Sequence, residues 1–332
     1  MRQERKNRIS GFDALKGIAC IAVVFMHCEF PGAMGTYIQC LTRWSVPLFF
    51  AVSGYFFQKE EAHYTLVKAN HILKITVWAT LFYIAFECFL HLYCGDLLVY
   101  VAEEFTLVNV AAFIVFNSPV FVNGHLWFLF ALLYVYLSYE VLIRLSIIKY
   151  EKQIGIVLLI CFFVLSYGFY LLGHPLQAGF YRNFLFEGLP FFLFGKYMRQ
   201  SILPKLYENR YKLAGGICLL IGCLLSVMER YLIGRDFSLH VSSVIILTAL
   251  FILAMRGSLE RVPKLITSIG RDYSMVVYII HPAIYLTMDS LCEVWSDDII
   301  YLWLRPIITL ILSIIVTKLF LNIKDRIVER NH

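Results

Sequence analysis

The sequence has few charged residues. Asp, Glu, Lys and Arg make up only 16% of its 332 residues, whereas hydrophobic residues make up 60%. Soluble globular domains average roughly 25% charged and about 45 to 50% apolar residues. This composition excludes an ordinary soluble domain, because so little charge cannot cover a surface in contact with water. We therefore expect lipid to be the main solvent.

The sequence also lacks paired cysteines. Its nine cysteines form no C-x-x-C pair, and most lie inside apolar runs, where Cys packs as a small hydrophobic side chain. We predict neither a disulfide framework nor a zinc site, and no metal cofactor. Internal repeats, linkers and low-complexity tracts are missing as well, which favours one domain over residues 1–332.

Two further absences concern the basic residues. The basic amino terminus precedes an apolar run, but that run carries Asp13 and Lys16 and has no convincing A-x-A cleavage site, so we expect a retained first helix and not a signal peptide. The net charge of +6 comes from short basic groups between apolar runs and not from one continuous basic face. This pattern excludes nucleic acid as a partner and favours a role in membrane topology.

Ten apolar segments have, or nearly have, the length of a transmembrane helix, for which a bilayer core requires about 17 to 25 residues. They are 11–28, 42–57, 72–94, 124–144, 153–173, 182–198, 212–231, 239–256, 272–291 and 299–321. Glu103 and Glu104 interrupt the run 98–117, which we interpret as an interfacial or re-entrant segment. The predicted fold class is therefore all-α, a polytopic membrane protein of about ten transmembrane helices.

Lysine and arginine indicate the orientation, since cytoplasmic loops hold the excess of positive charge. With both termini in the cytoplasm, ten spans place 23 of the 29 basic residues on the cytoplasmic side. The remaining six are Lys16, within the first span, and the outer residues Arg43, Arg182, Arg230, Arg235 and Arg305. An eleventh span at 98–117 would invert half of the molecule, so the asymmetry favours ten.

Ionisable side chains at membrane depth are the first functional candidates, because each costs at least about 2.5 kcal/mol to insert. Lys16 and His27 are eleven residues apart in the first span, which places them within roughly 20° of one helix face and about 16 Å apart along the axis. Asp13 lies one turn before Lys16 and can act as its counter-ion. The alternative is that Lys16 and His27 reach the two membrane surfaces by snorkelling.

Further polar side chains converge at the predicted outer ends of two spans. His125 and Trp127 begin the span 124–144, and Arg182 and Glu187 enter the span 182–198. Histidine changes its charge near neutral pH, and a glutamate can also transfer protons. These side chains are therefore candidates for contact with a substrate on the outer side.

The ninth predicted span has a polar face. Ser274, Tyr278 and His281 follow at i, i+4 and i+7 and share one side of the helix, and Pro282 loosens the backbone that follows. Such a face is typical of a polar interior. A network of interhelical hydrogen bonds without further function is the alternative.

Lys68 and Lys74 stand at the predicted cytoplasmic start of the third span, and Ser53 lies at the end of the second. Together these side chains could bind an anionic phosphate group. The alternative is that the lysines serve only as positive-inside topology signals.

Five stretches of the sequence resemble, in order and spacing, the acyltransferase-3 family of bacterial membrane acyltransferases. They are DALKGIACIAVVFMH (13–27), VPLFFAVSGY (46–55), HLWFL (125–129), GLPFFLFG (188–195) and SMVVYIIHP (274–282). The resemblance covers nearly the whole chain. It implies transfer of an acyl group, usually acetyl from cytoplasmic acetyl-CoA, to a hydroxyl or amine of an envelope glycan or a lipid-linked acceptor. It also implies a multi-pass protein of the bacterial cytoplasmic membrane, and it leaves a homo-oligomer open.

One position departs from the pattern of the family. The first helix of the family carries an arginine, ten intervening residues and then a histidine. Here His27 holds the histidine position and Lys16 stands in place of the arginine. Lysine keeps the charge but loses the bidentate fork of arginine. The region 68–74 likewise has lysine where the family's basic stretch after its second helix commonly has arginine.

The resemblance suggests a role for each candidate. His27 accepts a proton from the acceptor hydroxyl or takes the acyl group itself, while Asp13 and Lys16 fix the first helix and the donor arm. The donor is expected to contact Lys68, Lys74, Ser53, Ser274, Tyr278 and His281. The acceptor is expected to contact His125, Trp127, Glu187 and Arg182.

A carrier is the competing hypothesis. The sequence also resembles the membrane half of vancomycin-resistance serine racemases, a relative associated with serine uptake. The same polar residues could then bind a small polar solute such as serine without chemistry. The lack of inverted repeats argues against this hypothesis, because many carriers are built from them.

Overall fold

The computed structural model describes residues 10–57, 61–116, 124–202, 210–235, 237–295 and 297–330. Helices form almost all of this part of the chain, and it contains no β-strand, which confirms the all-α class. The chain divides into two compact units, which are described separately. Unit 1 comprises Met1–Leu48 and Leu206–His332, and unit 2 comprises Phe49–Lys205. The prediction of a single domain stays a prediction.

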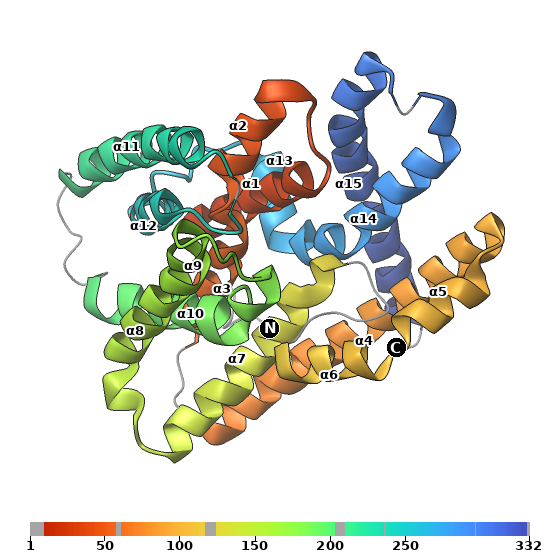
Figure 1. Ribbon diagram of the computed structural model, residues 1–332. Coiled ribbons are helices and arrows are strands. Elements are labelled where there is room, and N and C mark those ends of the chain that lie inside the picture. The colour runs from red at the N-terminus through yellow and green to blue at the C-terminus, as the bar shows by residue number, and fades with distance from the viewer. Residues whose placement is uncertain are drawn as a thin grey trace. The chain divides into compact units, whose positions relative to one another are not determined.

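Unit 1 is built from both ends of the chain (Figure 1). Its helices are α1 Ser10–His27, α2 Gly32–Thr42, α11 Arg210–Ile233, α12 Val241–Met255, α13 Lys264–Ser268, the π-helical turn η9 Ile269–Tyr273, α14 Ser274–Leu291, the short η10 Glu293–Trp295 and α15 Ile299–Arg330. Helix α3, Ser45–Tyr55, is divided between the two units.

Helix α1 is the core of unit 1. It contacts α2, α12, α13, η9, α14 and α15, and side chains such as Leu15 and Val24 are fully buried. Glycine lets its backbone approach the neighbouring helices: a Cβ at Gly17 would collide with the carbonyl oxygen of Ile266, and a Cβ at Gly270 with that of Asp13. Small residues at such crossings are typical of helix packing in membranes.

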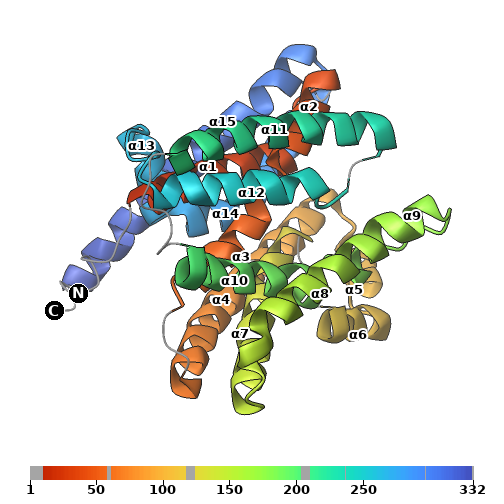
Figure 2. The same cartoon turned by 90° about the vertical axis from the view of Figure 1, so that its left-hand side faces the viewer.

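Unit 2 contains the middle of the chain. Its elements are α4 Ala62–Cys94, α5 Leu97–Glu104, α6 Leu107–Phe116, η2 Gly124–Leu126, α7 Trp127–Arg144, η3 Ile148–Tyr150, α8 Glu151–Phe163, η4 Val164–Gly168, α9 Phe169–Leu171, η5 Ala178–Phe180, η6 Phe184–Gly188, α10 Leu189–Tyr197 and η7 Met198–Ile202. Helices α4 and α7 lie side by side, and α10 packs on α8 (Figures 1 and 2). Gly54 of α3 and Gly195 of α10 allow these two helices to touch, since a Cβ at either would meet a backbone carbonyl of the other helix.

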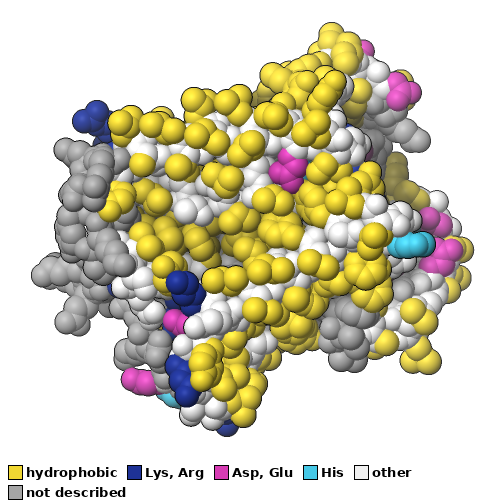
Figure 3. Space-filling model, turned by 60° about the vertical axis from the view of Figure 1, so that its left-hand side comes forward, with side chains coloured by type: hydrophobic (Ala, Val, Ile, Leu, Met, Phe, Trp, Pro, Cys, Tyr) yellow, Lys and Arg dark blue, Asp and Glu magenta, His cyan; other side chains and the backbone are white. Residues whose placement is uncertain are grey.

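Seven helical segments of the described chain are long and apolar enough to cross a membrane. They are Ser10–His27, His63–Cys94, Gly124–Arg144, Ile148–Leu171, Tyr211–Ile233, Lys264–Leu291 and Ile299–Ile327. Hydrophobic side chains cover most of the face shown in Figure 3, as expected for a surface in lipid. The chain is therefore a polytopic membrane protein. The count of ten spans and the orientation stay predictions, since α12 has 15 residues and α3 only 11.

Several helices extend beyond their predicted segments. Continuous helical structure begins at Lys264, before residue 272, and α15 continues to Arg330, past residue 321. Helix α4 begins at Ala62 and not near residue 72, because polar residues can extend a helix beyond the apolar part that signals a span. Lys68 and Lys74 therefore lie inside α4 and not at its start. The ambiguous run forms two short helices, α5 and α6, of 8 and 10 residues, and not the continuous helix that an eleventh span would need.

Candidate functional site

The two charged candidates of α1, Asp13 and Lys16, form an ion pair. The Lys16 Nζ atom lies 2.8 Å from Oδ1 of Asp13, so the predicted ion pair is present. Asp13 is buried, while the Lys16 side chain keeps 23% of its exposure. The backbone of α1 approaches η9 closely at Asp13, because a Cβ at Gly270 would collide with the carbonyl oxygen of Asp13.

His27, at the end of α1, lies beside His281 of α14. The centroids of the two imidazole rings are 5.3 Å apart, and the ring planes are inclined by 51°. His281 is fully buried and His27 is half-buried. Packing of α1 on α14 thus brings together two imidazole side chains that are far apart in the sequence.

A backbone hydrogen bond orients the ring of His281. Its Nδ1 lies 3.1 Å from the carbonyl oxygen of Val277, one turn earlier in α14. A carbonyl oxygen can only accept, so Nδ1 carries the hydrogen and donates it. In the neutral ring, Nε2 then holds the lone pair and is the atom that can accept a proton.

The other two candidates of α14 differ in their surroundings. Tyr278 is buried, with its ring centroid 6.3 Å from that of His281. The Ser274 hydroxyl donates to the carbonyl of Gly270 at 3.2 Å, within the preceding turn. The structure therefore places Tyr278 beside the histidine pair, whereas the hydrogen bond of Ser274 joins the start of α14 to the preceding turn η9.

Sequence reasoning missed a polar cluster between α14 and α15. Arg305 lies 3.1 Å from Oδ2 of Asp289, and the Tyr301 hydroxyl donates to Oδ1 of Asp289 at 2.7 Å. In the same region of unit 1, the buried Cys28 follows His27 directly and its sulfur lies 3.6 Å from the Thr309 hydroxyl. The available signal was the charge of Arg305 inside the apolar run 299–321, which we had assigned to topology alone.

In unit 2, the structure brings together two of the four predicted acceptor-binding residues. The Arg182 guanidinium lies over the indole ring of Trp127, 5.2 Å from its centroid, in the geometry of a cation–π contact. Trp127 is buried at the start of α7. The contact holds the start of α7 against the segment that leads into η6.

The other two predicted acceptor-binding residues are deeply buried in unit 2. His125 precedes α7 and packs edge-on against Tyr83 of α4, with 4.8 Å between ring centroids. Glu187 lies in the π-helical turn η6, whose first turn is capped by the Asn183 side chain accepting from the amides of Leu185 and Phe186. Burial of both an imidazole and a carboxylate in a membrane protein is typical of functional positions.

The residues predicted to bind the donor in unit 2 are dispersed. The Lys68 Nζ atom lies 5.3 Å from the ring centroid of Tyr64, whereas Lys74 is exposed on α4. The Ser53 hydroxyl donates to the carbonyl of Phe49 inside α3 at 2.8 Å. These contacts of Lys68 and Ser53 lie within their own helices, and neither joins a lysine of α4 to Ser53 of α3.

A buried lysine in α10 was also missed. Lys196 is 2% exposed, and its ammonium group contacts the Tyr139 hydroxyl and lies 3.3 Å from Oε2 of Glu151. Three residues later, Arg199 donates to the carbonyl of Tyr55 at 3.1 Å. The signal was present in the motif GLPFFLFGK, where Lys196 ends an apolar run, but it was counted only as a cytoplasmic charge.

The described residues contain no group of three or more His, Cys, Asp or Glu side chains that could hold a metal ion.

Comparison with known protein families relates most of the chain to a family of enzymes. The acyltransferase-3 family model, described as an acyltransferase domain, matches residues 9–320. No curated protein and no solved structure matches the chain. Because the family model covers almost the entire sequence, the chain belongs to the acyltransferase-3 family.

Proposed function

We propose that this membrane acyltransferase moves an acyl group, acetyl in the first instance, from cytoplasmic acyl-CoA to a hydroxyl or amine of an envelope glycan or a similar acceptor. Membership in the family supports acyl transfer in general. The single observation that carries the chemistry is the proximity of the His27 and His281 rings in the interior of unit 1. We place the protein in the bacterial cytoplasmic membrane.

In this proposal His27 is the general base. It takes the proton of the acceptor hydroxyl as the oxygen attacks the thioester carbonyl, and the imidazolium then returns the proton to the departing thiolate of CoA. Neutral His281, whose ring is oriented by its hydrogen bond to Val277, stabilises the positive charge that forms on His27. A positioned general base contributes typically about 10²- to 10⁴-fold to the rate.

The Asp13–Lys16 pair positions the helix that carries His27. Both residues lie on α1, Asp13 is buried, and α1 packs against η9. Lys16 supplies one positive charge at the position where the family pattern has arginine. We propose that this charge fixes α1 and faces the donor arm.

We also propose ten spans with both termini in the cytoplasm. The seven long apolar helices account for seven of the ten predicted segments. The remaining three segments contain α3, α10 and α12, and α10 is extended at both ends by the π-helical turns η6 and η7. This arrangement places the greater part of the lysine and arginine in the cytoplasm.

The test is transfer of labelled acetyl from acetyl-CoA in reconstituted membranes. We expect His27→Ala to lose transfer to envelope glycan by at least about 10²-fold, because the base is removed. His174→Ala is the matched control, since His174 is exposed outside the helices. Undiminished transfer by a folded His27→Ala protein would refute the mechanism. Stabilisation of the protein by serine with no response to CoA would favour the carrier instead.

A further inference from the structure

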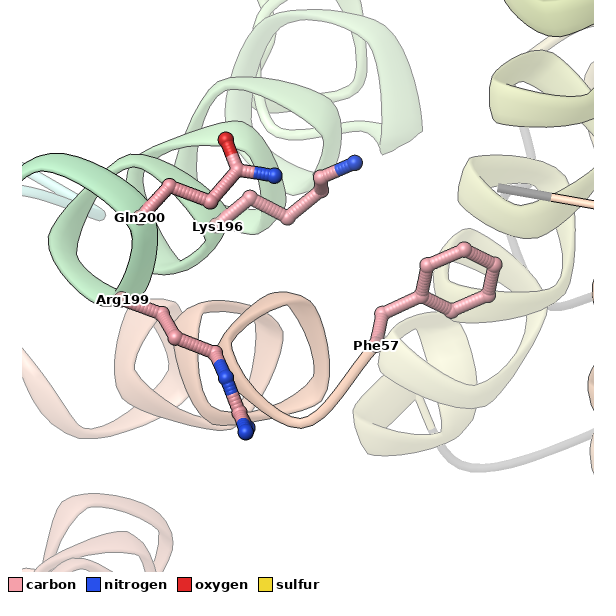
Figure 4. A pocket seen from close by; sticks show the side chains of 4 residues that line it. All are labelled: Phe57, Lys196, Arg199 and Gln200. Carbon is pink, nitrogen blue, oxygen red and sulfur yellow. The ribbon is translucent and has the colours of Figure 1, made fainter. Parts of the chain in front are cut away.

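A cavity of about 310 Å³ lies in unit 2 between the end of α3 and the end of α10 (Figure 4). Phe57, Lys196, Arg199 and Gln200 line it. Lys196 and Gln200 project from one side of the helix, and Arg199 projects toward the end of α3, where it donates to the carbonyl of Tyr55 (Figure 4). Arg199 and Gln200 belong to the π-helical turn η7, a type of irregularity that is frequent at functional sites.

Contacts with neighbouring side chains hold Lys196 in a fixed position at this cavity. Its ammonium group lies 4.4 Å from the ring centroid of Tyr139 and 5.9 Å from that of Phe57, in addition to its ion pair with Glu151. A buried charge is costly unless it is paired and hydrogen-bonded, and these groups meet that requirement. Lys196 is thus a positive charge held at a defined place, unlike a lysine that moves freely at a membrane surface.

Arg199 is also held in place. Its guanidinium lies 5.3 Å from the ring centroid of Tyr55, and it donates to the carbonyl oxygen of the same residue. A guanidinium stacks on an aromatic ring through its face, so the N–H donors on its edge can still bind acceptors. The exposed Gln200 adds an amide that can donate to an oxygen.

The cavity carries positive charge on its lining, and the Glu151 carboxylate, 3.3 Å from Lys196, offsets part of it. The lining, among the described residues, contains two cations and no carboxylate. A third cation lies close by, because Lys68 approaches the ring of Tyr64, and Tyr64 packs against Phe57 at 5.1 Å. Fixed lysine and arginine side chains with an amide are the groups that bind phosphate oxygens.

We propose that this cavity binds a phosphate or pyrophosphate group. Resting on the proposed function, we assign that group to the nucleotide part of the acyl-CoA donor. The volume lies at the lower end of the roughly 300 to 1,000 Å³ of ligand sites, which suits one or two phosphates and not a whole coenzyme. This proposal deepens the proposed function by placing donor contacts at Lys196 and Arg199.

The experiment adds a carboxylate to the cavity. Gln200→Glu is isosteric and changes an exposed residue, so it should leave the fold intact, and it should weaken CoA binding by roughly tenfold through repulsion of the phosphates. Gln153→Glu is the matched control, since Gln153 is an exposed glutamine of α8 outside the lining. Affinity is measured by calorimetry on the full chain in detergent. S-acetylpantetheine, which has no phosphate, should bind both variants equally.

A second variant removes a charge from the lining. Arg199→Gln keeps a hydrogen-bonding side chain at the same position, and we expect it to weaken CoA binding while leaving S-acetylpantetheine unaffected. Raising the salt concentration should weaken CoA binding to the natural protein more than to Arg199→Gln. Salt screens the attraction between Arg199 and the phosphates, and the variant no longer has that attraction.

Further experiments with other phosphate-containing probes identify the source of the phosphate. Inorganic pyrophosphate is added to the detergent-solubilised protein, and nanodiscs of phosphatidylglycerol are compared with nanodiscs of phosphatidylcholine. If Gln200→Glu and Arg199→Gln weaken CoA binding and Gln153→Glu does not, the donor assignment is supported. A different result is that the two cavity variants leave CoA binding unchanged and abolish only the thermal stabilisation of the protein by pyrophosphate or by phosphatidylglycerol. That result supports a phosphate site and overturns its assignment to the donor.

Equal behaviour of Gln200→Glu and Gln153→Glu with every probe overturns the phosphate site itself. These readouts measure binding and not transfer. A His27→Ala protein that retains full transfer refutes the proposed chemistry whatever the calorimetry shows. A failure of the cavity variants to alter CoA binding leaves the chemistry of His27 standing.

Discussion

His27 and His281 lie with their ring centroids 5.3 Å apart, one at the end of α1 and the other buried in α14. The buried partner donates from Nδ1 to Val277, which leaves Nε2 as its basic atom. The pair combines a half-buried imidazole with an oriented one. An imidazole that accepts a proton is stabilised when a second, neutral imidazole is its neighbour, since a neutral imidazole can accept a hydrogen bond from an imidazolium.

The tautomer of His281 gives the first prediction. In His281→Asn the amide can still donate to Val277, but no nitrogen remains in the position of Nε2. We expect near-natural thermal stability and a fall in transfer rate of about 10²-fold or more. The melting temperature and the rate of acetyl transfer are measured together. A natural rate in this variant would exclude a role for Nε2.

The ion pair of α1 gives the second prediction. Asp13→Asn leaves Lys16 without its carboxylate and should reduce the free energy of unfolding by roughly 1 to 3 kcal/mol, less than for a fully buried pair because Lys16 is partly exposed. Lys16→Arg keeps the charge and should keep stability. Thermal unfolding in detergent measures both. The double variant Asp13→Asn with Lys16→Met has no unpaired charge and should recover stability. If it is as unstable as Asp13→Asn alone, the carboxylate does not act by compensating the charge of Lys16.

The crossing of α1 and η9 gives the third prediction. Gly270→Val places a side chain against the Asp13 carbonyl, so α1 must move, and we expect loss of stability of about 1 to 3 kcal/mol or failure to fold. Gly216→Ala is the control, because a Cβ at this position of α11 meets nothing within 4 Å. The monodispersity and the melting temperature of the Gly270→Val and Gly216→Ala proteins are compared. Equal stability of both variants would show that α1 does not pack as described.

The Arg182–Trp127 contact gives the fourth prediction. If this pair contacts the acceptor, Trp127→Phe should raise the KM for acceptor several-fold with little change in kcat, since the weaker ring loses about 0.5 to 2 kcal/mol of cation–π attraction. The KM for acetyl-CoA should not change. Steady-state kinetics with varied acceptor provide the measurement. A fall in kcat alone would assign the pair to the chemical step or to folding.

The orientation gives the fifth prediction. Cys94 is exposed at the end of α4, and Lys149 is exposed between α7 and α8. With ten spans Cys94 lies outside and residue 149 inside, whereas an eleventh span at 98–117 places both outside. In intact cells, an impermeant maleimide should label a protein whose sole cysteine is Cys94. A second protein, whose sole cysteine replaces Lys149, should react only after the cells are permeabilised. Labelling of this protein in intact cells would support eleven spans.

The sequence by itself determined the helices and the local pairings. Long apolar runs predicted the helical segments because a backbone in lipid must satisfy its hydrogen bonds within the segment. The Asp13–Lys16 pair was also predictable, since residues three apart are neighbours on a helix. The shared face of Tyr278 and His281 follows from the same periodicity. Helix α4 shows the limit of this reasoning, because its first turns are polar and carry no apolar signal.

Only the tertiary structure decided which polar residues meet. Nothing in the local pattern shows that His27 lies beside His281, because that contact depends on how α1 packs against α14. The same holds for Lys196, whose role depends on Glu151 and Tyr139 from other helices and not on its place at the end of an apolar run. The periodicity of a helix specifies directions around its own axis. Contacts between helices follow from side-chain packing and close backbone approach, as at Gly17 and Gly270, which only the folded chain brings about.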